Sequence, residues 1–458
     1  MNKPIPFDGL TAQIAELNPV RSIGRVTRVE AGIVQVAGLA GKARIGDLVI
    51  IYRHGEPLSG EVLKLDGKNL VLLPEQEPDG VALNDRAALL EPRGLAPSEG
   101  WIGRIIDPFG NPIDGKPLLR GPRARKLRGS PPNPGKRRAM GDRLNTGMAA
   151  LNTILPIVQG QRVGLFAGAG VGKSSLLGHL AQHMTAEIVV IALIGERGRE
   201  LRHFIEEILG PEGLKRAVVV CATSDQSPLI RRRCAWAAMA VAEHFRDEGK
   251  SVLLLADSIT RFAEAHREVA VASGEAPVLR GYPPSTAHLI MSLCERAGPG
   301  TSQQGDITGI FSVLVAGSDM DEPIADILRG VLDGHVVLDR DIAERGRYPA
   351  VNVLRSVSRS LPAAANDAEN HLISITRKIL STYEQNAMMI RAGLYTSGSD
   401  AEIDTAVQVW PELDQFFARP EEQSVENSFA QLELLMRRNK VATRIEGSRT
   451  TNRRPPAA

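Results

Sequence analysis

A glycine-rich segment, AGAGVGKSS at residues 167–175, has the composition of a phosphate-binding loop. It follows an apolar run typical of a strand and precedes a pattern typical of a helix, which is the context that such a loop requires. Its small residues allow successive backbone N–H groups to turn toward an anion at the helix N-terminus. The predicted loop consists of Ala167, Gly168, Ala169, Gly170, Val171, Gly172, Lys173, Ser174 and Ser175. We expect Lys173 to contact the β- and γ-phosphates of a nucleotide, and the Ser174 hydroxyl to bind Mg²⁺.

The spacing of the glycines distinguishes this loop from a dinucleotide-binding fingerprint. The G-x-G-x-x-G pattern is not met, because Gly168, Gly170 and Gly172 alternate and a lysine follows them. Ala167 stands where the general P-loop pattern has its first glycine, and this change costs little while three glycines remain. The segment is therefore interpreted as a P-loop.

Two carboxylates end apolar, strand-like runs, at the sheet edge where ligands bind in open α/β folds. Asp257 ends SVLLLAD and is the expected carboxylate for Mg²⁺, with capping of the helix that follows as the alternative. Glu196 ends EIVVIALIGE, where a carboxylate beside the γ-phosphate could polarise an attacking water molecule. Arg197 is expected to pair with Glu196 or with phosphate oxygens. The alternative for Glu196 and Arg197 is an exposed, charged helix start.

The elements that must position these residues fall into three regions and a tail. Residues 20–95 contain short β-type runs separated by Gly and Asp turns, which predicts a small β-barrel. Residues 96–365 alternate continuous apolar strands with helical patterns, which predicts an α/β domain with a parallel sheet covered on both faces. Residues 366–445 carry helical patterns alone, and the polar residues 446–458 are predicted to be disordered.

Composition narrows the class of protein. The 458 residues include 55 Lys or Arg and 53 Asp or Glu, so the chain as a whole is not built to bind a polyanion. The cysteines Cys221, Cys234 and Cys294 are widely spaced in apolar surroundings, and we expect buried thiols instead of disulfides or a metal site. The N-terminus lacks the apolar stretch of a signal peptide, and the apolar run at 188–195 is too short for a membrane span. A cytoplasmic protein with only peripheral membrane contact is expected.

Five segments together resemble the rotary ATPase superfamily of proton-translocating ATP synthases. They are FAGAGVGKSS, IGERGRE, LLLADSITRFA, RGYPPS and DGHVVLDRDIAERGRYPAVNVLRSVSRS. More narrowly, the chain resembles the ATPases of the flagellar and virulence type III protein export systems from about residue 20 to residue 445. The acidic C-terminal loop typical of catalytic synthase subunits has no counterpart in RAGLYTSGSDAEIDTAV, which favours an export ATPase. The resemblance implies Mg²⁺-dependent ATP hydrolysis by a RecA-like P-loop core, with an N-terminal β-barrel and a C-terminal helical domain.

The resemblance also implies roles for single residues. By resemblance, Lys173 and Ser174 bind phosphate and Mg²⁺, Glu196 orients the attacking water, and Asp257 is the Walker B carboxylate. These are the roles already expected of them. Arg197 and Arg261 fall at positions near the phosphates. Tyr348 falls where the family stacks an aromatic ring on adenine, and the alternative is an ordinary half-buried tyrosine.

The segment NVLRSVSRSLP at 352–362 offers a further cation for the site. The P-loop, Lys173 and Mg²⁺ neutralise much of the triphosphate charge, but not the charge that grows on the γ-phosphoryl oxygens during reaction. We expect Arg359 to supply this charge from a neighbouring subunit, with Arg355 as the fallback and an ordinary salt bridge as the alternative. Because one chain carries both Glu196 and Arg359, the resemblance implies a homohexamer in which every subunit is catalytic. A scaffold that binds ATP without turnover conflicts with this pair.

The remaining expectations concern partners. Residues 1–19 have apolar residues at helix-face spacing, and the resemblance implies that this segment docks a dimeric regulator. The alternatives are a helix that packs on the chain's own barrel and a disordered segment. Further expected partners are a central stalk protein, the export gate membrane complex at the inner membrane, and export substrates with their chaperones. A hexameric RNA translocase would need base-stacking aromatics on the barrel, and before Arg93 only Phe7 and Tyr52 are present. No nucleic acid is expected, and the basic linker at 120–143 is interpreted as solvated charge on an extended strap.

Overall fold

The structure is a computed structural model of the 458-residue chain. It describes residues 20–30, 32–90, 94–278, 280–315 and 320–441, together with Thr11 and Ile14. The described residues form two compact units, drawn from 1–141, 159–182 and 186–335 (unit 1) and from 142–158, 183–185 and 336–458 (unit 2). The N-terminal docking segment, apart from Thr11 and Ile14, and the predicted disordered tail lie outside the described residues. Within the described part of the chain, no helix combines the length and apolarity needed to cross a membrane.

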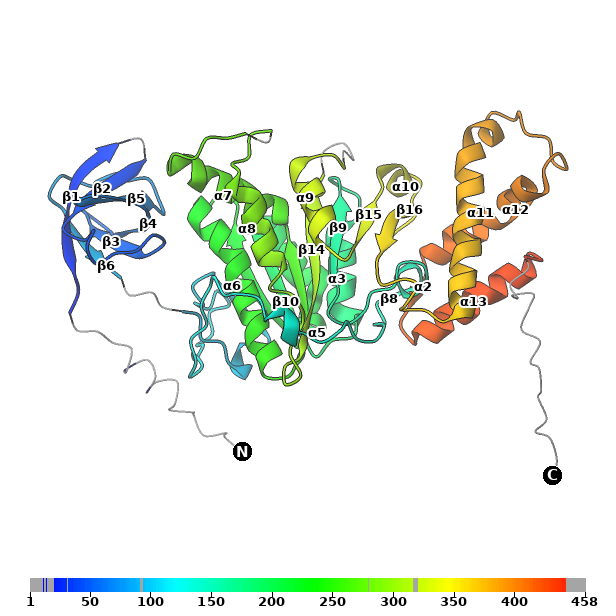
Figure 1. The fold of residues 1–458 in the computed structure, drawn as a ribbon, viewed down its shortest axis with the longest axis horizontal. Coiled ribbons are helices and arrows are strands. Elements are labelled where there is room, and N and C mark those ends of the chain that lie inside the picture. The colour runs from blue at the N-terminus through cyan, green and yellow to red at the C-terminus, as the bar shows by residue number, and fades with distance from the viewer. Residues whose placement is uncertain are drawn as a thin grey trace, which may run out of the picture. The chain divides into compact units, whose positions relative to one another are not determined.

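Unit 1 contains a closed barrel of six strands where the sequence predicted a small β-barrel (Figure 1). Its strands are β1 (Ile23–Glu30), β2 (Ile33–Ala37), β3 (Leu48–Tyr52), β4 (Leu58–Asp66), β5 (Asn69–Pro74) and β6 (Arg86–Leu89). They pair antiparallel in the order β1-β2-β5-β4-β3-β6, and β6 closes onto β1. Alternate side chains point inward, so that Val34, Val36, Leu70 and Leu72 are fully buried. The barrel therefore has a hydrophobic core of its own.

The second part of unit 1 is a parallel sheet with the order β9-β14-β12-β10-β11-β7. These strands are β7 (Arg104–Ile106), β9 (Arg162–Ala167), β10 (Ile188–Glu196), β11 (Ala217–Thr223), β12 (Ser251–Asp257) and β14 (Asp306–Leu314), and β13 (Gly298–Pro299) pairs antiparallel with β14. Strands β10, β12 and β14 are buried along nearly their whole length, as expected for a sheet covered on both faces. The carboxyl ends of these parallel strands lie at the same edge of the sheet. The loops that follow the strands are therefore close in space although they are distant in sequence.

Helices follow these strands in the alternation that the sequence predicted. They are α3 (Lys173–His183), α4 (Gly198–His203), the π-helix η3 (Phe204–Leu209), α5 (Gly210–Leu214), α6 (Pro228–Asp247), α7 (Ile259–Ala272), α8 (Ser285–Cys294) and α9 (Pro323–Val331), with 3₁₀ turns η1 (Glu99–Trp101) and η2 (Pro134–Lys136). Ser227 caps α6 and Ser258 caps α7, each through its side-chain oxygen. The three cysteines are free and buried, as predicted. The described residues contain no cluster of three or more His, Cys, Asp or Glu side chains able to hold a metal ion.

The basic linker differs from its interpretation as solvated charge. Arg125 forms an ion pair with Asp247 of α6. The Arg128 guanidinium lies 4.3 Å from the ring centroid of Trp236, also in α6, which is a cation–π contact. The linker is extended, as predicted, but arginines in it bind the core. The physical reason is that an extended strap makes few hydrogen bonds within itself, so its backbone and side chains bond to the core, as the Arg125 N–H does to the Leu95 carbonyl at 2.6 Å.

Unit 2 includes the predicted helical domain (Figure 1). Its elements are β8 (Gly147–Met148), α2 (Ala149–Thr153), α10 (Arg340–Glu344), β16 (Val351–Ser358), α11 (Asp367–Arg391), α12 (Ala401–Phe417), β17 (Pro420–Glu421) and α13 (Val425–Arg438), and β15 (Gly334–Leu338) leads the chain into this unit. A capping box of Asn366 and Glu369 starts α11. The rings of Tyr383 and Trp410 stack with centroids 4.5 Å apart, which joins α11 to α12.

Candidate nucleotide-binding site

The glycine-rich segment forms a loop between a strand and a helix. Strand β9 ends at Ala167 and helix α3 begins at Lys173. Gly170 and Gly172 have φ angles of 77° and 87°, a left-handed conformation that side chains with a Cβ rarely adopt. The Leu176 N–H donates to the Gly172 carbonyl at 3.0 Å, so the first turn of α3 starts directly at the loop. The loop therefore presents backbone N–H groups at the positive end of a helix dipole.

Lys173 and Asp257 are brought together by the tertiary structure. Asp257 ends β12, and its carboxylate Oδ1 forms an ion pair with the Lys173 ammonium; these side chains are 4% and 10% exposed. The Ser312 hydroxyl of β14 donates to the same Oδ1 at 2.7 Å. The helix-cap alternative for Asp257 is not seen, because Ser258 accepts the Arg261 N–H at 3.4 Å and caps α7 instead. Asp257 is thus held toward the P-loop.

Glu196 lies at the same edge of the sheet. Strands β10 and β12 run parallel with Leu193 opposite Asp257, and a bulge at the end of β10 includes Gly195 at a φ of 68°. Burial raises the pKa of Glu196 to about 7, and the negative charge of Asp257 adds to the rise while Lys173 opposes it. A carboxyl group that titrates near neutrality is suited to accept a proton from water.

The arginines near this edge are arranged differently. Arg197 is exposed, and its guanidinium lies 3.4 Å from Glu200 at the start of α4. This placement matches the alternative of a charged helix start for Arg197, and contact with phosphate stays a prediction. Arg261 lies beside Gly195, since a Cβ built on that glycine would be 3.6 Å from the Arg261 Cβ. Its guanidinium contacts Glu264 at 3.2 Å.

The donor set fits a Mg²⁺ ion. This ion is usually held by one or two protein oxygens, while phosphates and water complete its octahedral shell. Ser174 and Ser175 lie in the first turn of α3, and Asp257 supplies a buried carboxylate. Within the described part of the chain, Lys173 and Ser312 both contact Oδ1 of Asp257, so Oδ2 is the oxygen offered to a metal ion or its water.

The other two predicted site residues belong to unit 2. Tyr348 precedes β16 and its side chain is 51% exposed, an exposure that suits stacking on a ligand. Arg359 follows β16 and is also exposed. Its neighbours Ser358 and Ser360 both donate to the carbonyl of Pro156, at 2.6 Å and 3.2 Å. These two bonds fix the backbone on either side of Arg359.

Arg355 has a local partner. Its guanidinium lies 3.7 Å from the Asp339 carboxylate, and Asn352 donates to that carboxylate at 3.0 Å. Arg355 therefore neutralises a carboxylate of its own unit, and the role of Arg359 as a cation offered to another subunit stays a prediction.

Two residues that shape the site were not predicted from the sequence. Ser312 holds the Asp257 carboxylate, and the signal for it was a single hydroxyl in the apolar run ITGIFSVL. Gly195 forms the bulge that precedes Glu196, and its signal was a glycine directly before a strand-end carboxylate. Neither signal identifies a partner without the register of neighbouring strands.

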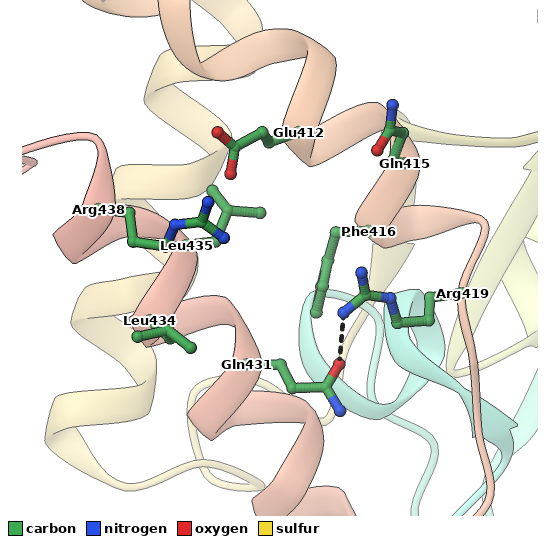
Figure 2. A pocket seen from close by; sticks show the side chains of 8 residues that line it. All are labelled: Glu412, Gln415, Phe416, Arg419, Gln431, Leu434, Leu435 and Arg438. Carbon is green, nitrogen blue, oxygen red and sulfur yellow. Dashed lines mark hydrogen bonds between the residues drawn. The ribbon is translucent and has the colours of Figure 1, made fainter.

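Unit 2 also contains a groove of about 340 Å³ between α12 and α13 (Figure 2). Its lining residues are Glu412, Gln415, Phe416, Arg419, Gln431, Leu434, Leu435 and Arg438. An Arg419–Gln431 hydrogen bond of 3.0 Å crosses one side of it. No residue of the predicted nucleotide site lines this groove.

A P-loop, a buried strand-end aspartate and a neighbouring glutamate on one edge of a parallel sheet define a P-loop nucleotide hydrolase. Comparison with known proteins agrees with this class. Residues 147–358 match the model of the ATP synthase alpha/beta family, nucleotide-binding domain. Residues 365–434 match the T3SS EscN ATPase C-terminal domain.

Full-length relatives narrow the class. The chain is 42% identical over 434 residues to a flagellum-specific ATP synthase of Caulobacter vibrioides, covering 92% of this chain and 98% of that protein. It is 44% identical over 400 residues to the flagellum-specific ATP synthase of Bacillus subtilis, covering 86% and 90%. The structure of the assembled ATPase EscN from the type III secretion system of enteropathogenic E. coli is similar with a TM-score of 0.82 and 34% identity, covering 90% of this chain and 99% of that one.

The chain therefore belongs to the ATP synthase alpha/beta family and, within it, to the group formed by the flagellum-specific ATP synthases and the type III secretion ATPases. It is an ATPase, as the sequence predicted, and its substrate is ATP. The α/β fold class with barrel, RecA-like core and helical C-terminal domain is likewise confirmed.

Proposed function

We propose that this ATPase serves a flagellar type III protein export apparatus, hydrolysing ATP with Mg²⁺ as a homohexamer. The observation that carries the hydrolytic role is the placement of Glu196, whose pKa is raised by burial and by the charge of Asp257, while Lys173 opposes the rise. Flagellum-specific relatives matched over nearly their whole length support the flagellar role. The second candidate is a virulence type III secretion ATPase, which the match to the EscN C-terminal domain favours.

The site residues act in complementary ways. Lys173 and the loop N–H groups bind the β- and γ-phosphates, which orients the terminal phosphoryl group for in-line attack. Glu196 positions the attacking water and accepts its proton, and Ser312 keeps the Asp257 carboxylate oriented. Mg²⁺, held by Ser174 and Asp257, would supply neutralisation of the phosphate charge. Arg359 of one subunit stabilises the charge that develops in the site of its neighbour.

A solved relative supports one of the proposed partners, the central stalk. EscN has been solved in complex with its central stalk EscO, and that structure is similar to this chain with a TM-score of 0.81. We therefore include a central stalk protein among the partners, together with a dimeric regulator at residues 1–19, the export gate complex, export substrates and their chaperones. The enzyme would act at the cytoplasmic side of the inner membrane, attached peripherally to the apparatus.

Two substitutions separate binding from hydrolysis. Glu196→Gln should leave ATP bound and nearly stop turnover, because an uncharged amide cannot accept a proton from water. Lys173→Ala should weaken binding as well, because it removes a ground-state phosphate contact. Equilibrium nucleotide binding and steady-state phosphate release measure both effects. Turnover of Glu196→Gln within about threefold of wild type, under about 0.7 kcal/mol, would contradict the role of Glu196.

The cellular role has its own test. Expression of the chain in a bacterium lacking its flagellar export ATPase should restore motility, whereas Glu196→Gln should not. Restoration of virulence secretion alone, in a strain lacking its secretion ATPase, would favour the second candidate. Stimulation of hydrolysis by RNA would instead indicate a nucleic-acid translocase.

A further inference from the structure

The segment that follows Glu196 contains an unusual helix. After β10, the short helix α4 runs into the π-helix η3, in which the Gly210 N–H donates to the carbonyl of Ile205, five residues earlier. Helix η3 ends because Gly210 has a φ of 65° and Pro211 has no N–H to donate. Helix α5 follows directly with Leu209 as its N-cap, and the carbonyls at this junction also accept from side-chain donors.

Helix α3, which begins in the P-loop, supplies these donors. The Gln182 side-chain amide donates to the Ile208 carbonyl at 2.8 Å and to the Leu209 carbonyl at 2.9 Å. Gly178 lies one turn earlier on the same face of α3. A Cβ built on Gly178 would be 2.1 Å from the Ile208 Cγ2, so only glycine allows η3 to lie this close. Gly178 and Gln182 thus form a seat for η3.

Helix α4 depends on this seat. Helix α4 has no buried side chain, whereas Phe204 and Leu209 of η3 are buried. Only partly buried side chains such as Leu201 can pack, so the position of α4 is set mainly by β10 at one end and by η3 at the other. Arg197 is the cap of α4, and Glu196 directly precedes it. The seat formed by Gly178 and Gln182 therefore fixes η3, which is the C-terminal end of the segment that begins at Glu196.

We infer that Gly178 and Gln182 are positioning residues, through which the P-loop helix holds η3 and α4 and so places Glu196 for water attack. The inference rests on the proposed function, because it concerns the same site. Helix α3 carries Lys173 at its first turn and Gln182 at its last, so one rigid element contacts the phosphates and seats η3. Nucleotide binding and the placement of the catalytic carboxylate are linked by that helix.

Gln182→Met tests the inference, because methionine keeps the length of the side chain and removes both donors. We expect kcat to fall about tenfold or more while the nucleotide Kd stays within about twofold. Gln182→Lys restores a donor to both carbonyls and should recover most of the lost turnover. Gln385→Met is the matched control, since it removes a glutamine hydrogen bond to Ser381 in α11 and should leave kcat unchanged.

Two further measurements exclude a general loss of stability. Amide hydrogen exchange across residues 198–209 should become faster in Gln182→Met with nucleotide bound, while the P-loop helix keeps its protection. Gly178→Ala should also lower kcat, and adding Ile208→Ala should recover it by making room for the new methyl group.

The inference is overturned if Gln182→Met leaves kcat within about twofold of wild type, or if kcat and nucleotide affinity fall by the same factor. Unchanged exchange across residues 198–209 overturns it as well. Different results would overturn the proposed function itself: the wild-type protein would not hydrolyse ATP, or Glu196→Gln would retain turnover. The exchange measurement gives its result in either case.

Discussion

At the scale of single residues, the chemistry depends on how Glu196 is held. Its carboxyl group ends a strand, next to Asp257, which is in turn fixed by Lys173 and Ser312. The site therefore assigns different tasks to two carboxylates by their surroundings. Asp257 forms an ion pair with Lys173 and is the carboxylate proposed to face the metal ion. Glu196, half-buried beside a like charge, is poised to exchange a proton.

This difference predicts a pH dependence of kcat/KM. Burial and the charge of Asp257 raise the pKa of Glu196 to about 7, so below this pH the base is protonated and inactive. The value of kcat/KM should therefore rise with pH through about 7 and level off above it. Glu200 also raises the pKa of Glu196, so Glu200→Gln should move the rise to lower pH. Initial rates across the neutral range measure both curves, and a flat profile would speak against Glu196 as the base.

At the scale of elements, helices α6 and α7 join the barrel to the sheet. Arg232 of α6 forms an ion pair of 2.8 Å with Glu61 of barrel strand β4, and the two side chains are only 6% and 14% exposed. Leu63 of the same strand packs in a small apolar cluster with Leu229 of α6 and Val269 of α7. The barrel is thus attached to the core by a buried ion pair and by a small apolar cluster on the same strand.

The buried pair predicts a non-additive effect on stability. Glu61→Gln leaves the Arg232 charge buried with a weakened partner and should destabilise unit 1 by about 3 kcal/mol. Arg232→Met should cost a similar amount. The double substitution should cost clearly less than the sum, because it leaves neither charge unpaired. Urea unfolding of the four proteins measures the cycle, and strictly additive costs would show that the pair contributes nothing specific.

At the scale of the whole molecule, the residues predicted for the site belong to two different units. The P-loop, Glu196 and Asp257 belong to unit 1, while Tyr348 and Arg359 belong to unit 2. A homohexamer can bring Arg359 of one subunit to the phosphates of the next. The serines that anchor the backbone on both sides of Arg359 keep its position defined in such an assembly.

A mixed assembly tests whether Arg359 acts between subunits. Arg359→Ala should keep ATP affinity near wild type while turnover falls by about 10³-fold or more, and Arg355→Ala serves as the matched control. Mixing Arg359→Ala with Lys173→Ala protein creates interfaces that combine an intact P-loop with an intact arginine. Phosphate release should then partly return. No return, in preparations where mixed hexamers demonstrably form, would place the action of Arg359 within its own subunit or away from phosphate.

The sequence by itself determined those features that are encoded over short distances. The P-loop is continuous in the chain, and the period of apolar residues distinguished barrel strands, buried parallel strands and C-terminal helices without knowledge of their contacts. The buried cysteines followed from their apolar neighbours in the same way. Each of these properties depends on residues within about one element of one another.

The tertiary structure alone decided which distant side chains meet. Ser312 lies 55 positions after Asp257 and Gln182 lies 26 positions before Ile208, and only strand order and helix packing bring them together. The same holds for the choice between Asp257 and Ser258 as the cap of α7, since the sequence allows either residue. The linker arginines that bind the core follow this rule too. The pKa of Glu196 is decided in this way as well, because burial and a neighbouring charge arise from folding and not from local sequence.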